Sequence, residues 1–84
     1  MNKFILCAMD KSKTAEELKE NKMAADAAYD AADAADAYAA AAAYDAAAAA
    51  ASAADNMDYW LNRYFRRTGE NREDYEKAIK ELEK

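Results

Sequence analysis

The chain has 84 residues, of which 54% are apolar, and 25 of the apolar residues are alanine; it contains one Gly, no Pro, no His and one Cys. So few turn-forming residues among so many helix formers exclude a β-sandwich and a doubly wound sheet, and a single Cys excludes an intrachain disulfide. The net charge of −5 at pH 7 disfavours direct binding to nucleic acid, because an acidic surface repels phosphate. We therefore expect a single all-α domain over residues 1–84.

The N-terminal segment is the one stretch that predicts a β-strand. Residues 3–9, Lys-Phe-Ile-Leu-Cys-Ala-Met, are bulky and apolar on both faces, so residues 1–9 are expected to form a short extended arm. One strand cannot satisfy its own backbone, so the arm would pair with a second copy or add to the sheet edge of a partner. The apolar run from Phe4 to Met9 is too short for a secretory signal.

A long helix is predicted next. Thr14 followed by Glu17 is a capping box, the signature of a helix start. No strong helix breaker follows before Thr68 and Gly69, so the sequence predicts one helix over residues 14–67, about 78 Å long at 1.5 Å per residue. A kink near Asn21 or within residues 52–55 remains an alternative.

The C-terminal segment is predicted to fold back on this helix. Gly69 is placed to adopt the left-handed conformation that ends a helix, and Asn71 is placed to begin a second helix over residues 71–83. The two helices would form a hairpin whose core collects most of the larger apolar side chains. Its expected members are Met57, Trp60, Leu61, Tyr64, Tyr75, Ile79 and Leu82.

An alanine seam is expected along the long helix. At 100° per residue, one face carries only small side chains: Ala24, Ala28, Ala31, Ala35, Ala39, Ala42, Ala46, Ala49 and Ala53. Methyl groups allow two helix backbones to approach closely, and nothing else in one chain is long enough to cover such a face. The hypothesis is therefore self-association through this seam, as a coiled-coil-like dimer or a larger assembly. The alternative is a solvated rod formed because alanine favours helix.

No catalytic, metal or cofactor site is expected. The chain lacks His, and Cys7 lies in an apolar run that would raise its thiol pKa. A convex row of aspartates supplies two or three oxygens, not the six to eight that Ca²⁺ prefers. Membrane insertion is not expected either, because five Asp residues interrupt the alanine stretch.

The opposite face of the long helix is predicted to bind a partner. Carboxylates flank tyrosines there, which suits an Arg- or Lys-rich surface on another protein. The candidate residues are Asp26, Tyr29, Asp30, Asp33, Tyr44 and Asp45. Alternatively, the tyrosines seal the edges of a helical bundle. A basic cluster, Arg63, Arg66 and Arg67, is expected to complement the end of the long helix.

The two ends of the chain carry a resemblance. The opening Met-Asn-Lys-Phe-Ile-Leu-Cys-Ala-Met-Asp-Lys, the Ala/Asp/Tyr middle and the segment from Tyr59 to Tyr75 together resemble small alanine-rich proteins of T4-like tailed phages of enteric bacteria. The resemblance implies expression in the cytoplasm of an infected bacterium, where small accessory proteins bind host proteins or blunt defence systems. It implies no catalytic residues.

These observations together predict a non-enzymatic, oligomeric protein that binds a bacterial host protein and inhibits or redirects it. Two alternatives belong to other classes. The aspartate rows could imitate phosphates and occupy a nucleic-acid-binding enzyme, or the chain could be a structural assembly protein.

Overall fold

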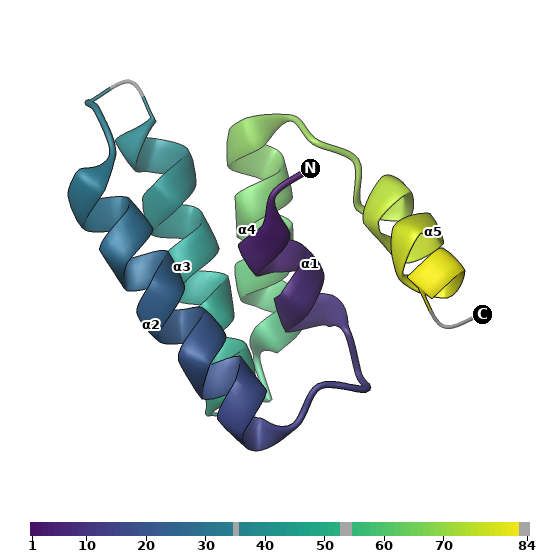
Figure 1. Ribbon diagram of the computed structural model, residues 1–84. Coiled ribbons are helices and arrows are strands. Elements are labelled where there is room, and N and C mark those ends of the chain that lie inside the picture. The colour runs from purple at the N-terminus through teal and green to yellow at the C-terminus, as the bar shows by residue number, and fades with distance from the viewer. Residues whose placement is uncertain (35, 53–54, 83–84) are drawn as a thin grey trace.

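A computed structural model describes residues 1–34, 36–52 and 55–82, and it contains five α-helices in these ranges (Figure 1). The helices are α1 (Lys3–Met9), α2 (Ala15–Ala31), α3 (Ala37–Ala51), α4 (Met57–Thr68) and α5 (Arg72–Leu82). The predicted helical character is confirmed. The predicted N-terminal strand and the single very long helix are wrong, because residues 3–9 are helical and the longest helix has 17 residues.

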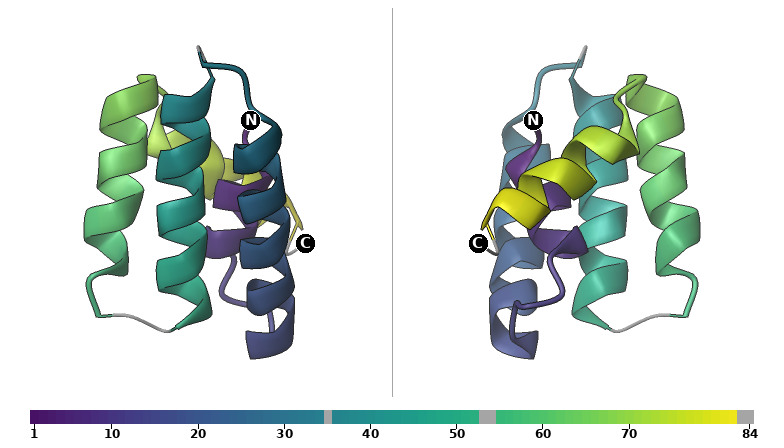
Figure 2. Two further views of the ribbon diagram at one scale, coloured as in Figure 1. Left: turned by 90° about the vertical axis from the view of Figure 1, so that its left-hand side faces the viewer. Right: turned by 90° about the vertical axis from the view of Figure 1, so that its right-hand side faces the viewer.

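The helices pack in two layers. α2, α3 and α4 run antiparallel side by side with α3 in the middle, and α1 and α5 lie across one face of this layer (Figure 2). α3 contacts α2, α4 and α1, so it is the central helix. The longest dimension of the molecule is 37 Å, about half the length expected for the single helix.

The first break in the predicted helix falls after Ala31. Ala32 adopts an extended conformation, and the carbonyl of Asp33 then accepts from the backbone N–H groups of Asp36 (2.9 Å) and Ala37 (2.8 Å), where α3 begins. No Gly or Pro causes this turn. Folding back brings two alanine-rich helices together and removes their methyl groups from water, which one straight rod cannot do.

The second break follows Ala51. The hydroxyl of Ser52 donates to the carbonyl of Ala48 at 3.1 Å, a local bond that competes with helix continuation. The helix therefore ends at Ala51, with Ser52, the first residue of the 52–55 region that the sequence left open, as its C-cap. At Asn21, the other alternative, α2 is not interrupted, and the side-chain amide donates to the carbonyl of Phe4 in α1 at 3.0 Å.

The predicted alanine seam is not a uniform face of the folded chain. In α3, Ala42, Ala46 and Ala49 are buried and Ala39 is half-buried, all within the single chain. In α2, by contrast, Ala24 and Ala31 are exposed and Ala28 is half-buried. Ala35 and Ala53 lie outside the described residues. The seam requires one continuous helix, and the chain turns between α2 and α3, so the nine alanines do not form one unbroken face. Self-association of the chain stays a prediction.

α1 is a helix because its N-terminus is capped and its apolar faces are buried. The side-chain oxygen of Asn2 accepts from the backbone N–H groups of Phe4 (2.9 Å) and Ile5 (3.3 Å). Ile5 is fully buried in the main core cluster. A short run that is apolar on all sides does not distinguish a strand from a buried helix, so the cap was the more informative signal.

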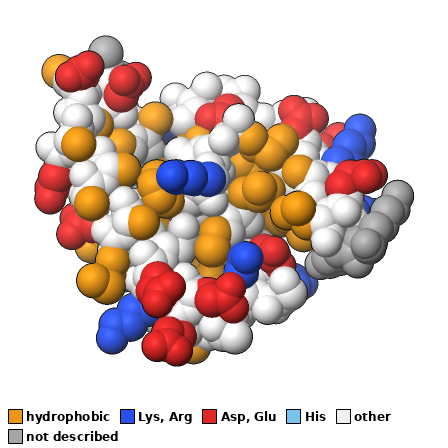
Figure 3. Space-filling view, viewed as in Figure 1, with side chains coloured by type: hydrophobic (Ala, Val, Ile, Leu, Met, Phe, Trp, Pro, Cys, Tyr) orange, Lys and Arg blue, Asp and Glu red, His pale blue; other side chains and the backbone are white. Residues whose placement is uncertain are grey.

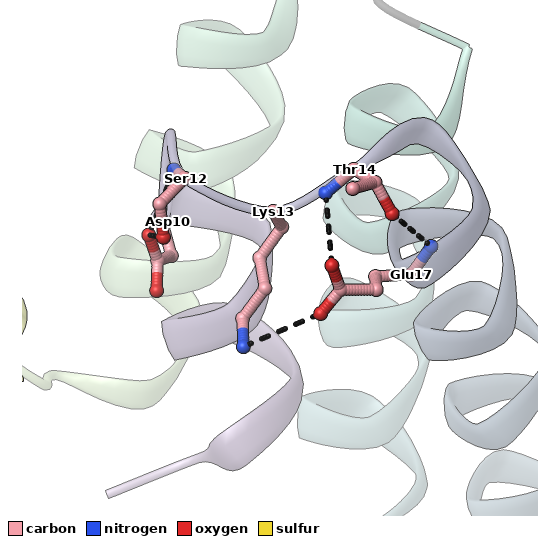
Figure 4. Close-up of polar contacts among 5 residues, drawn as sticks. All are labelled: Asp10, Ser12, Lys13, Thr14 and Glu17. Carbon is pink, nitrogen blue, oxygen red and sulfur yellow. Dashed lines mark hydrogen bonds and ion pairs between the residues drawn. The ribbon is translucent and has the colours of Figure 1, made fainter.

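The loop between α1 and α2 is held by its own side chains. Ser12 donates both its hydroxyl (2.6 Å) and its backbone N–H (2.9 Å) to Asp10, which is buried. The capping box predicted at the start of α2 is confirmed, with reciprocal bonds between Thr14 and Glu17 and an ion pair of 3.8 Å from Lys13 to Glu17 (Figure 4). These bonds fix the entry of α2.

The C-terminal segment turns as predicted but packs differently. Gly69 has φ of 74°, the left-handed conformation, and its N–H bonds to the carbonyl of Phe65 at 2.9 Å. Beyond its first turns, α5 crosses α1 instead of lying along α4, so the predicted α4–α5 hairpin is wrong (Figure 2).

One core cluster joins four of the helices. Its buried members are Ile5, Ala42, Ala43, Ala46, Leu61, Tyr64, Phe65 and Tyr75, and Leu6, Met9, Met57 and Trp60 pack against them. Among the residues expected in the hairpin core, Ile79 is half-buried and Leu82 is 67% exposed. Leu82 therefore lies outside the cluster, because α5 leads away from α4.

Candidate protein-interaction surfaces

Four of the six predicted partner-binding residues lie on one exposed surface. Asp26, Tyr29 and Asp30 are on α2, and Asp33 is in the turn that follows it; we call these four residues the acidic face. Tyr29 is 40% exposed. The four side chains make no hydrogen bond or ion pair with any other residue that the structure describes. Acidic side chains line this edge of the molecule over α2 in Figure 3.

The remaining two predicted residues lie on α3 and are half-buried. A carboxylate oxygen of Asp45 lies 3.9 Å from a guanidinium nitrogen of Arg63 on α4. α3 separates α4 from α2 in the three-helix layer, so this ion pair directs Asp45 away from the acidic face (Figure 2). The six residues would have shared one face of a continuous helix. The turn after α2 instead separates Tyr44 and Asp45 from the other four.

The reactive groups do not form a catalytic constellation among the described residues. Burial, partly offset by nearby Lys13, raises the pKa of the Cys7 thiol, and a raised pKa lowers the fraction of nucleophilic thiolate. No group of three or more Asp, Glu, Cys or His side chains is gathered in metal-binding geometry in the part of the chain described.

A groove that the sequence did not predict lies between α1, α4 and α5. It has a volume of about 480 Å³, and Met9, Leu61 and Ile79 contribute to its apolar walls. Hydrophobic side chains between α1 and α5 are visible in Figure 3. Part of its charged lining is engaged in ion pairs: Arg72 pairs with Asp58 at 3.0 Å and with Glu76 at 3.4 Å. No sequence signal indicated this groove, because it exists only where α5 crosses α1.

A buried hydrogen-bond network connects the two ends of the chain. The Tyr64 hydroxyl donates to Glu70 at 2.6 Å, and the Tyr75 hydroxyl donates to the other carboxylate oxygen of Glu70. The backbone N–H of Asn2 donates to the Tyr75 hydroxyl at 2.7 Å. Both tyrosines are 1% exposed. The network therefore fixes α1, α4 and α5 relative to one another, which is a structural role.

The exposed side of α4 carries the basic cluster. Tyr59, Arg63, Arg66 and Arg67 follow one another at helical spacing and line a shallow depression of about 520 Å³. Arg66 and Arg67 lie in the last turn of α4, where they complement the helix dipole. The sequence predicted the arginine cluster, but it did not indicate that Tyr38, an aromatic side chain of α3, joins it.

No protein-family model, curated protein or solved structure matches the chain. None of the described helices combines the length and apolar character needed to cross a bilayer. Function must therefore be inferred from the surfaces of this chain itself.

Proposed function

We propose that this chain is a small, non-enzymatic binding protein whose acidic face binds a basic surface of another protein. The supporting observation is the acidic face itself: three carboxylates and a phenol held on one helix and its following turn, with no partner among the described residues. Met23, one turn before Asp26, is 63% exposed and adds an apolar contact beside the carboxylates. On such a surface the charges orient the partner as it approaches, and the apolar side chains contribute binding energy once they are buried.

The rigid position of α2 favours this function. The helix is capped by Thr14 and Glu17 at its start, and its buried side packs on α3 and α1. A row of charges on a fixed helix loses little conformational freedom when it binds, so more of the interaction energy is retained. The resemblance to phage accessory proteins suggests that the partner is a bacterial host protein, which the chain would inhibit or redirect.

The decisive experiment is affinity purification from bacterial cells, identification of the bound proteins, and direct binding to each purified candidate. The test variant is Asp26→Asn with Asp30→Asn, and the matched control is Glu16→Gln with Glu20→Gln. All four positions are exposed on α2, and each pair of changes moves the net charge from −5 to −3. We expect a basic partner that the test variant loses and the control keeps.

Equal loss in both variants would show that net charge, not the acidic face, drives binding. Equal retention in both would remove the acidic face from the interface. Competition by duplex DNA, with a steep dependence on salt, would favour nucleic-acid mimicry instead. Recovery of the chain mainly in assembled particles would favour a structural role.

A further inference from the structure

A second surface, of opposite charge, lies on α4 and the start of α3. Tyr59, Arg63, Arg66 and Arg67 form its α4 side. Tyr38 from α3 completes it, because the Arg67 guanidinium carbon lies 4.6 Å from the centroid of the Tyr38 ring. We call these five residues the arginine face.

Two of the three arginines of this face, Arg63 and Arg67, lie over aromatic rings. The Arg63 guanidinium lies 5.4 Å from the Trp60 ring centroid, and its one carboxylate contact, to Asp45, is long at 3.9 Å. Arg67 lies over Tyr38. A guanidinium placed on a ring keeps N–H donors available for another ligand, and it is partly ordered before binding.

The charge of the arginine face is mostly uncompensated within the chain. Arg66 is exposed and has no ion-pair partner among the described residues, and the same is true of Arg67. Three guanidinium groups and the single carboxylate of Asp45 leave a local excess of positive charge on a chain whose net charge is −5. This excess makes the face complementary to an anionic ligand.

The composition of the face favours a protein ligand. Tyr38 is 68% exposed and Tyr59 is 55% exposed, and both flank the arginines. Tyr and Arg are enriched among the residues that dominate binding energy at protein interfaces. A carboxylate can accept two parallel N–H bonds from one guanidinium while an apolar side chain packs against a tyrosine ring.

Nucleic acid is the less favourable ligand. Affinity for its phosphate backbone grows with the number of phosphates neutralised, and this face offers three cations on a strongly acidic chain. We infer that the arginine face binds an acidic segment of a partner protein, one that carries both carboxylates and an apolar or aromatic side chain. This inference goes beyond the proposed function, because it concerns a different surface and a ligand of opposite charge.

The two faces are separate in the fold. α3 lies between α2 and α4, so the α2 part of the acidic face and the α4 part of the arginine face lie on opposite sides of the three-helix layer (Figure 2). Each surface can therefore be tested by variants that leave the other intact, and failure of one proposal does not entail failure of the other.

The test is a titration of the isotopically labelled protein with a short synthetic peptide of Asp and Glu residues around one Tyr, followed by NMR. The test variant is Arg66→Glu with Arg67→Glu, and the matched control is Lys19→Glu with Lys77→Glu. Each pair reverses two exposed cations and moves the net charge from −5 to −9. A milder variant, Arg66→Gln with Arg67→Gln, is used if circular dichroism shows that the charge reversal unfolds α4.

We expect saturable shifts of the Arg Nε–H signals and of the amides around Tyr38 and from Tyr59 to Arg67. The test variant should weaken binding about tenfold or more, equivalent to at least about 1.4 kcal/mol, and the control should weaken it much less. A peptide with Asn and Gln in place of Asp and Glu should produce no saturable shifts at these positions.

Four outcomes would overturn the inference. The first is the absence of saturable shifts on the arginine face, and the second is equal weakening by the test variant and the control. The third is tighter binding of a single-stranded oligonucleotide to the same amides, which would assign the face to nucleic acid. The fourth is a concentration-dependent shift of these signals without peptide, lost in the test variant, which would assign the face to a second copy.

Discussion

α2 and α3 come from the same alanine-rich stretch, yet their environments differ sharply. α2 buries one residue, Ala25, whereas α3 buries six of its 15 residues. α3 lies between α2 and α4 and also meets α1, so its methyl groups are covered on several sides. α2 forms the edge of the layer and exposes its aspartates. Whether an alanine of this protein is buried therefore depends on the position of its helix in the bundle.

This difference in burial gives the two helices different roles: α3 forms the core of the bundle, and α2 presents side chains to solvent. α3 carries a single charged residue, Asp45, and its small side chains let three helices approach it closely. α2 carries Asp26 and Asp30 on its outer side, where they cost no desolvation and remain available to a partner. Substitutions and pH changes that act on the enclosed helix α3 and on the edge helix α2 should therefore differ in their effect on stability.

The largest expected effect is overpacking of α3. Ala46 is 0% exposed, so Ala46→Leu must displace neighbouring helices, and we expect a loss of about 3 kcal/mol in the free energy of unfolding. Ala24 belonged to the same predicted seam but is exposed on α2, so Ala24→Leu should change stability by less than about 0.5 kcal/mol. Urea unfolding followed by circular dichroism measures both. Similar losses at the two sites would contradict the enclosed position of α3.

The second effect is alkaline destabilisation of the core beside α3. Burial, and then the hydrogen bond to Glu70, raise the pKa of Tyr64 and of Tyr75 above the ordinary value of 10.0. The unfolded chain then releases these protons at lower pH than the folded chain, so stability is retained below pH 10 and falls above it. At pH 11 we expect a loss of about 1 kcal/mol from Tyr64. Tyr75 should contribute a loss in the same direction.

Urea unfolding between pH 8 and pH 11 measures this loss, and Tyr64→Phe should make the decline shallower. A variant that declines as steeply as the original chain would show that Tyr64 does not carry the effect. Tyr29→Phe on the exposed face of α2 is the control, and we expect it to leave the decline unchanged.

A third, smaller effect compares the N-termini of the two helices. Thr14 caps α2 by accepting from the N–H of Glu17 at 3.1 Å, so Thr14→Ala should cost about 1 kcal/mol. Asp36 precedes α3 without a side-chain cap bond, and Asp36→Ala should cost no more than a few tenths of a kcal/mol. Thermal melts of the two variants test the difference. A reversed order would mean that α3 depends on its cap more than on its packing.

The smallest effect is expected in acid, at the loop before α2. Hydrogen bonds from Ser12 lower the pKa of Asp10, and bonds from Thr14 lower the pKa of Glu17. A carboxyl group with a lowered pKa stabilises the fold above its unfolded pKa, and this contribution is lost as the pH falls through the folded pKa. Stability should therefore decrease gently below about pH 4. Ser12→Ala removes the hydroxyl donor to Asp10 and should reduce the acid dependence. An unchanged profile would exclude this bond as a source of it.

Part of the fold was predictable because its signals are local. The capping box at Thr14 and Glu17 and the left-handed Gly69 depend on bonds between residues close in sequence, and both were found. The residues of the acidic face were likewise placed on one exposed side, since their spacing lies mostly within one helix. Asp45 was misplaced with them, because its position depends on a turn that no local residue signals.

The sequence by itself determined that this protein is helical and where α2 starts and α4 ends, because capping and alanine propensity act within a few residues. The tertiary structure alone decided that the long alanine stretch folds back at Asp33 and that α5 crosses α1 to form a groove. It also joined Tyr38 to the arginines of α4. These features depend on contacts between distant segments that remove methyl groups and aromatic rings from water, and no local pattern encodes which segments will meet.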